Sequence, residues 1–399
     1  MIENKESVVI TGYGSISPLG FEKEKIWKNY LSEKSFIKNI LFNEKLYPVG
    51  ALSKDAENKI QSFIERNIKL KKLDRTALLA IIAANEAFTD AEWNNKKALL
   101  TGVTIGSSRG ATKTWEEYHE KFLQTGKTHL LTSPLTTLGN ISSSVADYLS
   151  IEGPVISHSV TCSTTIQSIA NSVAWLKAGM ADKFLAGGSE APLTKFTLAQ
   201  LESLGIYSKF LNDEFPCRPL ELNANSMVIG EGAAVFAVEK LKKEEIKNKK
   251  IYAVIESAGF AFEKNPSATG ISANGENFQK AMKMALKNRN DKNDIDLILM
   301  HAPGTIAGDK AELTAIREVF KNKIPNLYSN KFNIGHTYAA SAALNLELAL
   351  MIFRNQIVPD IPYKTAFQNT KKEINKIMIN AAGFGGNAAS LVLSNIKSG

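Results

Sequence analysis

The stretch SHSVTCSTTIQSIANSVAWLKAGMADKFLAGGSEA, residues 157–191, contains the pattern from which the fold of this chain can be predicted. A β-like segment precedes Cys162, and the residues after it are apolar at the spacing of one helix face, with Gly179 placed to end that helix. A second apolar strand follows at 184–191. This order predicts an α/β fold with Cys162 at a strand-to-helix turn.

The same alternation of strands and helices extends on both sides of this stretch. It runs from the strand pattern at 7–15 to a lysine-rich connection at 241–250 and then restarts. At 399 residues the chain also exceeds the roughly 250–300 residues that one hydrophobic core usually serves. We therefore expect two halves of similar order, 1–245 and 246–399, although no residue-level repeat relates them.

Composition places the chain among ordinary globular proteins. Apolar residues make up 44% and charged residues 22% of the sequence. The N-terminus lacks the basic region and apolar run of a secretory signal, and no stretch approaches the roughly 18 apolar residues that would span a bilayer. We expect a cytoplasmic protein without a membrane span.

The net charge of +8 favours an acidic partner. Its lysines are scattered and mixed with acids, as on solvated helix faces, so we predict an acidic protein partner and no nucleic acid. A dinucleotide site after the first strand is also disfavoured. Gly12 and Gly14 have the required spacing, but Ser17 occupies the third glycine position and Pro18 follows it.

Two cysteines exclude a disulfide framework and leave each thiol as core filler or as chemistry. Cys162 is predicted at a helix entrance, where unpaired N–H groups and the helix dipole favour thiolate over thiol. We therefore expect Cys162 to be a nucleophile. Cys217 has no such context and is predicted to be structural.

Two of the five histidines are placed for catalysis. His301 ends an apolar strand and is followed by Pro303 and Gly304, so it should project from the edge of a parallel sheet. His336 follows a glycine and precedes a helix rich in small residues. Together with an activated cysteine, two imidazoles indicate acyl transfer, in which they donate to a thioester or enolate oxygen. The remaining histidines are predicted to lie elsewhere: His119, His129 and His158.

Five ordered motifs carry a resemblance that runs nearly end to end: VVITGYGSISPLG, VTCSTT with LAGGSEA, HAPGTIAGDKAE, SNKFNIGH and GFGGNAAS. In these motifs the chain resembles the β-ketoacyl-[acyl-carrier-protein] synthases, condensing enzymes of fatty-acid and polyketide synthesis with a thiolase-type fold. The resemblance implies a five-layered αβαβα arrangement of two similar halves, with the active site at their junction.

The resemblance also implies a role for each site residue. Cys162 would take the acyl chain from a carrier-protein thioester. His301 and His336 would hold the malonyl thioester and stabilise the enolate that forms as carbon dioxide leaves. That enolate would attack the acyl-Cys162 carbonyl in a Claisen condensation and lengthen the chain by two carbons.

Further residues match supporting positions of the family. Lys331 resembles the active-site lysine, and Glu312 the acid that pairs with it. Phe384 matches a gating phenylalanine, and its backbone N–H and that of Cys162 would be oxyanion donors. Thr305 remains as a hydroxyl for the pantetheine arm.

The resemblance implies no metal and no resident cofactor, because the phosphopantetheine arm arrives on the acyl carrier protein. It also implies a homodimer, with a heterodimer containing a related ketosynthase-like chain as an alternative. The basic residues of 69–75 fall where similar enzymes contact the acidic carrier, and a solvated helix start explains them equally well: Lys69, Lys71, Lys72 and Arg75.

The sequence departs from the family pattern around the expected pocket. Pro303 replaces the first threonine of the His-Gly-Thr-Gly-Thr motif, Thr165 a glycine and Ala382 a phenylalanine, and the usual Arg-Asp-Gly is missing before 230–232. These changes suggest a specialised synthase, for instance one that extends a polyene or an aryl-primed chain.

Two other classes of protein compete with this interpretation. A thiolase would need a second, C-terminal cysteine, and no cysteine follows Cys217. A non-catalytic partner subunit of the chain-length-factor type would have lost the nucleophile, whereas the proposed catalytic set is present: Cys162, His301, Lys331 and His336.

Overall fold

The computed structural model describes residues 6–42, 44–93, 100–211, 213–264, 270–287, 294–321, 323–367, 369–370 and 373–396. Within these ranges, no helix combines the length and the apolar character needed to cross a membrane.

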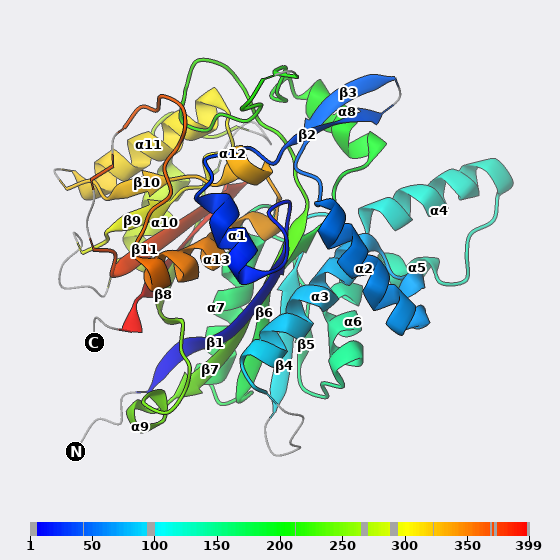
Figure 1. Ribbon diagram of the computed structural model, residues 1–399, viewed down its shortest axis with the longest axis horizontal. Coiled ribbons are helices and arrows are strands. Elements are labelled where there is room, and N and C mark those ends of the chain that lie inside the picture. The colour runs from blue at the N-terminus through cyan, green and yellow to red at the C-terminus, as the bar shows by residue number, and fades with distance from the viewer. Residues whose placement is uncertain are drawn as a thin grey trace.

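A large mixed sheet forms the centre of the molecule (Figure 1). Its strand order is β10-β9-β11-β12-β8-β1-β7-β6-β4-β5. The strands are β1 (Ser7–Ile16), β4 (Thr101–Gly106), β5 (Val155–Ile156), β6 (Lys183–Glu190), β7 (Gly232–Leu241), β8 (Ala253–Phe262), β9 (Leu297–Leu299), β10 (Asn326–Tyr328), β11 (Lys376–Gly383) and β12 (Asn387–Ser394). A separate hairpin consists of β2 (Lys38–Phe42) and β3 (Lys45–Val49).

The pairing pattern of the first half of the sheet repeats in the second. Strand β1 is antiparallel to β7, which is antiparallel to β6, and β4 and β5 follow in parallel. In the same way β8 pairs with β12, β12 with β11, and β9 and β10 follow in parallel. A short antiparallel pairing of β1 with β8 joins the two halves.

Helices cover both outer faces and fill the space between the halves. They are α1 (Lys23–Tyr30), α2 (Lys54–Arg66), the 3-10 helix η1 (Ile68–Lys72), α3 (Arg75–Asp90), α4 (Thr112–Thr125), α5 (Thr132–Thr136), α6 (Asn140–Leu149), α7 (Thr164–Lys177), α8 (Lys195–Ser203), α9 (Lys243–Ile246), α10 (Glu276–Ala285), α11 (Ile306–Phe320), α12 (Lys331–Ile334) and α13 (Ala340–Asn355).

Five layers result from the way these helices pack. Helices α7 and α13 contact each other and strands of both halves, α3 and α6 cover the outer face of the first half, and α10 and α11 cover that of the second (Figure 1). The predicted αβαβα arrangement is therefore confirmed. Every residue of α13 from Ala340 to Phe353 is buried, as expected for a helix enclosed on all sides.

Side-chain alternation along the strands explains how one sheet serves separate cores. In β6, Phe184 and Ala186 face the core around α7 and α13, whereas Leu185 faces the core beneath α3. In β11, Ile377 likewise faces the central core. Because successive residues of a strand point to opposite faces, apolar residues on both faces bury the strand between two helical layers.

Candidate active site

Cys162 lies in the turn that leads into α7, directly before the N-cap residue Ser163. Thr161, the residue before it, has a φ of +51°, in the left-handed region that β-branched residues rarely adopt. Gly383 at the end of β11 lies against this turn, where a Cβ atom would approach Thr161 Oγ1 to 1.6 Å. The turn that presents the cysteine is therefore strained and is supported by a position that only glycine fits.

The closest polar neighbour of the Cys162 thiol is an imidazole. His336 Nε2 lies 3.1 Å from Sγ, and His336 Nδ1 lies 2.9 Å from Ser341 Oγ. Burial, reinforced by the charge of Lys331, lowers the pKa of His336 well below its ordinary value, so the ring is neutral. With Nε2 accepting from the thiol, Nδ1 carries the proton and donates it to Ser341, which leaves Nε2 able to receive the thiol proton.

The expectation that the helix entrance favours a thiolate is wrong for Cys162. Burial raises the pKa of Cys162 to about 12, and the carboxylate of Glu190 adds to that rise. The cost of placing a charge in a buried site exceeds the help from the positive charge of Lys331 and from the backbone N–H of Cys162. Attack by this thiol therefore requires transfer of its proton to a base, and His336 is in position to receive it.

His301 follows the end of β9 and is buried. Its ring centroid lies 5.1 Å from that of His336, and the two rings are perpendicular. Burial and the nearby charge of Lys331 lower the pKa of His301 well below its ordinary value. Two neutral imidazoles beside one thiol can donate N–H groups to an oxygen that gains negative charge.

Glu312 has a different role from the one predicted. Its carboxylate accepts hydrogen bonds from the backbone N–H groups of His301 at 3.0 Å and Ala302 at 2.8 Å, and from the Asn380 amide at 3.1 Å. Within the described ranges, Lys331 Nζ has no hydrogen-bond partner, so the expected direct pairing with Glu312 is not observed. Glu312 instead fixes the backbone that carries His301.

Lys331, the first residue of α12, is buried behind the site. Burial lowers its pKa to about 8, while the carboxylate of Glu312 and other nearby acidic groups oppose the shift. A buried ammonium without hydrogen-bonding partners is costly. Its positive charge acts on Cys162, His301 and His336 through space, as the pKa shifts of all three show.

A pocket of about 320 Å³ collects five of the seven predicted site residues. The five that line it are Cys162, His301, Thr305, His336 and Phe384. The Thr305 side chain also caps α11 by accepting from the Gly308 N–H at 3.3 Å. Phe384 lines the pocket and is 42% exposed. Lys331 and Glu312 lie outside the lining.

Of the three single-residue departures from the family pattern, two lie where they were expected. Pro303 and Ala382 line the pocket. Thr165 does not, which corrects its predicted position: it is buried in the first turn of α7, and its hydroxyl donates to the Ala339 carbonyl at 2.5 Å. Its contact ties the helix behind Cys162 to the loop that follows His336.

The sequence did not predict two residues that lie beside Cys162 and His336. Tyr338 lines the pocket and stacks on His336, with ring centroids 5.4 Å apart and planes at 15°, although its φ is +47°. Glu190 is buried at the end of β6 and accepts from the backbone N–H groups of Ser108 and Ala339. Glu190 thereby joins the loop after β4 to the loop after His336. An acid at the end of a buried strand was the available signal for Glu190.

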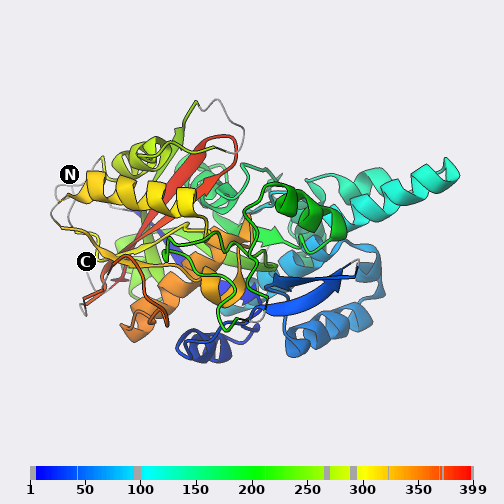
Figure 2. The same ribbon diagram turned by 90° about the horizontal axis from the view of Figure 1, so that it is seen from above.

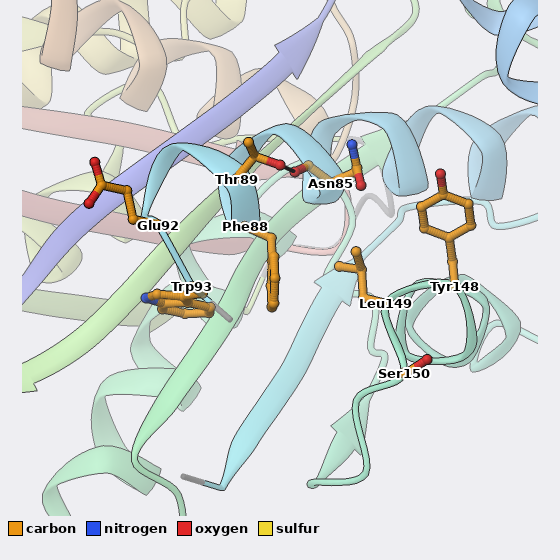
Figure 3. A pocket seen from close by; sticks show the side chains of 8 residues that line it. All are labelled: Asn85, Phe88, Thr89, Glu92, Trp93, Tyr148, Leu149 and Ser150. Atoms are coloured by element: carbon orange, nitrogen blue, oxygen red, sulfur yellow. Dashed lines mark hydrogen bonds between the residues drawn. The ribbon is translucent and has the colours of Figure 1, made fainter. Parts of the chain in front are cut away.

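A second, open pocket of about 540 Å³ lies where α3 and α6 end and shares no lining residue with the first (Figure 3). Phe88 and Trp93 pack edge to face there, and Trp93 Nε1 donates inward to Glu239 at 2.7 Å. Cys162, His301 and His336 all line the other pocket.

The remaining predictions concern residues outside the pocket. Cys217 is buried, and His119 and His129 are exposed on or beside α4, as predicted. In the basic stretch, Arg75 is engaged by Glu57 and Glu231, so only its lysines present exposed charges.

Comparison with solved structures defines the class of fold. The alignment with the ishigamide ketosynthase/chain length factor covers 98% of this chain and 99% of that chain, with a TM-score of 0.88 at 20% sequence identity. The alignment with a type II polyketide ketosynthase, solved in complex with its acyl-carrier protein, covers 98% of this chain and 100% of that chain, with a TM-score of 0.86 at 22% sequence identity. These likenesses place the fold among the thiolase-like ketosynthases.

Sequence comparison then gives the family. Residues 5–244 match the β-ketoacyl synthase N-terminal domain and residues 252–363 the C-terminal domain, so the chain belongs to the β-ketoacyl synthase family. A 3-oxoacyl-[acyl-carrier-protein] synthase 2 of Staphylococcus aureus is 28% identical over the full length of both chains. The Nodulation protein E of Rhizobium meliloti is 30% identical and covers 88% of this chain and 87% of its own. The chain is a carbon–carbon bond-forming acyltransferase of fatty-acid or polyketide synthesis.

Proposed function

We propose that Cys162 is the nucleophile of a decarboxylative Claisen condensation. In the first half-reaction, Sγ attacks the carbonyl carbon of an acyl thioester while His336 Nε2 takes the thiol proton. The bond from carbonyl carbon to the departing sulfur breaks, and that sulfur leaves as a thiol with the proton. The acyl group remains on Cys162 as a thioester.

In the second half-reaction, His301 and His336 donate N–H groups to the thioester oxygen of a malonyl group. His336 does so in the tautomer that carries its proton on Nε2, with Nδ1 accepting from the Ser341 hydroxyl. The bond to the carboxylate breaks, carbon dioxide leaves, and its electron pair passes into an enolate that the two imidazoles stabilise. The enolate carbon attacks the acyl-Cys162 carbonyl. A new carbon–carbon bond forms and the bond to Sγ breaks, which leaves Cys162 as a thiolate. The thiolate takes up one proton from solvent as the β-ketoacyl product departs.

The observation that carries this proposal is the contact of 3.1 Å between Cys162 Sγ and His336 Nε2, with His301 against the same ring. The backbone N–H groups of Cys162 and Phe384 are the proposed oxyanion donors. Support comes from Gly383, which directly precedes Phe384 and lies against the nucleophile turn without room for a side chain.

We further propose that both thioesters arrive on an acyl carrier protein whose phosphopantetheine arm enters the pocket past Thr305. A similar solved ketosynthase was captured with its acyl-carrier protein, which supports this partner. The arm supplies the thioester sulfur, so the proposed reaction uses no cofactor or metal held by this chain.

The test is intact-protein mass spectrometry after incubation with saturated, polyunsaturated and aryl acyl-carrier proteins. We expect one acyl adduct per chain, absent in Cys162→Ala and retained in Cys217→Ala. An adduct that persists in Cys162→Ala would place the nucleophile elsewhere. A wild-type chain that accepts no donor would favour the alternative, a non-catalytic subunit of the chain-length-factor type.

The assembly we propose is a dimer, either of two identical chains or with a related ketosynthase-like chain. The edge strand β5 ends the sheet, and α4 projects from the body in both views (Figures 1 and 2). Its outer side exposes 53% of Trp115 and 70% of Leu123. Exposed apolar side chains on a projecting helix are typical of a subunit interface. We expect a dimer in sedimentation analysis and a shift towards monomer in Trp115→Glu/Leu123→Glu.

The substrate we propose is a specialised chain, for instance a polyene or an aryl-primed chain. Pro303 and Ala382 in the pocket lining support this proposal, since they replace a hydroxyl and a bulky ring of the family pattern. In a competition assay, Ala382→Phe should lower the preference for a polyunsaturated or aryl donor over a saturated one. Saturated donors preferred by the wild-type chain would contradict the proposal.

A further inference from the structure

A groove of about 550 Å³ adjoins the Cys162 pocket on the outer side of the second half. The two cavities share Ile271 and Ala307 in their linings, so the groove continues from the rim of the pocket. Leu222 and Leu313 form part of its apolar floor.

One face of α11 forms the charged wall of this groove. Ala307, Lys310, Thr314 and Arg317 all line it, and their spacings of three, four and three residues place them on one side of the helix. Lys310 and Arg317 are exposed. Neither has a hydrogen bond or an ion pair with any side chain in the described part of the structure. Among the described residues, nothing therefore neutralises the two positive charges that the groove presents.

The position of these charges follows from the geometry of α11. The helix begins after Thr305, which lines the Cys162 pocket, and runs away from it. With a rise of about 1.5 Å per residue, Lys310 lies about 8 Å and Arg317 about 18 Å along the axis from Thr305. A donor whose arm enters the pocket must rest its own surface beside this mouth.

We infer that the α11 face, Lys310 and Arg317 with Thr314 between them, is a docking surface for the acidic acyl carrier protein. This inference rests on the proposed function. Charge complementarity supports this surface, because two cations without a partner in the described ranges line the groove beside the entrance. In the other basic stretch, Arg75 is held by Glu57 and Glu231, and the exposed lysines line neither cavity: Lys69, Lys71 and Lys72. Carboxylates of the carrier near its arm would pair with Lys310 and Arg317, and the apolar floor would receive side chains from the same carrier surface.

The experiment compares two kinds of acyl donor in the full chain. The rate of Cys162 acylation is measured by mass spectrometry at subsaturating acyl-carrier protein, and separately with acyl-pantetheine, which carries no protein. The variants are Lys310→Glu/Arg317→Glu and the milder Lys310→Ala/Arg317→Ala. The control is Lys243→Glu/Lys247→Glu, which makes the same charge change on and beside α9, outside both cavities.

We expect the charge-reversal variant to be acylated from the carrier about tenfold or more slowly than wild type, and its rate to depend less on salt concentration. The alanine variant should be acylated from the carrier about threefold more slowly. Acylation from acyl-pantetheine should stay within about twofold, and the control should match wild type with both donors. Unchanged acylation from the carrier in both variants would overturn the docking surface while leaving the proposed function standing, as would equal losses with both donors. A wild-type chain acylated by neither donor would overturn the proposed function itself.

Discussion

The Cys162 thiol and the His336 imidazole form a buried, neutral pair, with Sγ 3.1 Å from Nε2. Burial raises the pKa of the thiol to about 12 and lowers that of the imidazole, so the proton stays on sulfur until a substrate arrives. We therefore expect reactivity in this site to depend on the contact between the two side chains more than on a preformed thiolate.

Replacing His336 by alanine should therefore slow Cys162 acylation by roughly 10²–10⁴-fold, the range for a lost general base. The rate that remains should increase as pH rises from about 7 to 9, because the thiol must then lose its proton to solvent. His158→Ala is the matched control, since His158 is partly buried and bonds weakly to Ser168. Rapid-quench mass spectrometry gives the rates. Equal acylation rates in His336→Ala and wild type would contradict this role.

Lys331→Met should stabilise the fold below pH 8. The pKa of Lys331 is lowered from 10.5 to about 8, so below pH 8 the folded state carries a buried ammonium that the unfolded state keeps in water. This cost is about 3 kcal/mol at most. Between about pH 8 and 10.5 the unfolded state binds more protons than the folded state, so the free energy of unfolding of the wild type rises with pH and the cost disappears. Denaturant unfolding of both chains at about pH 7 and pH 10 measures the difference. A variant less stable than wild type at neutral pH would contradict it.

Glu312→Gln should loosen the backbone that carries His301. A glutamine side chain keeps one acceptor but places an amide N–H against the N–H groups of His301 or Ala302, which should cost about 1–3 kcal/mol of stability. Decarboxylation of malonyl-carrier protein should fall more than acylation of Cys162, because His301 serves only the second half-reaction. The exposed Glu318→Gln on the same helix is the control for both assays. Parallel losses in the two half-reactions would argue against this selective role.

Tyr338 should act through its ring. Tyr338→Phe keeps the stack on His336 and is expected to change acylation by less than about twofold. Tyr338→Ala removes it and should slow acylation by roughly tenfold, equivalent to the upper range of about 0.5–1.5 kcal/mol for a ring pair. Glycine adopts the φ of +47° without strain, so Tyr338→Gly should be more stable in denaturant than Tyr338→Ala. Its rate of Cys162 acylation should be as slow as that of Tyr338→Ala. If the phenylalanine variant were as slow as the alanine variant, the hydroxyl would be the functional group.

The layered fold could be predicted because the apolar pattern of each segment reflects its surroundings. The helix 164–177 and the strand 183–190 appear within two residues of their predicted ends. The repeat of topology between the halves could not be found in this way. It consists of the order in which strands pair, and different side chains satisfy the same pairing.

Sequence alone determined the candidate groups for the chemistry: a thiol at a helix entrance and two imidazoles in loops, with Lys331 and Glu312 nearby in the motifs. Tertiary structure decided how those groups behave. It directed the Glu312 carboxylate to the amides of His301 and Ala302 instead of to Lys331, and it kept the Cys162 thiol protonated. The physical reason is that hydrogen-bond partners and pKa values depend on burial and on neighbours brought from distant parts of the chain, which residue identity and spacing do not encode.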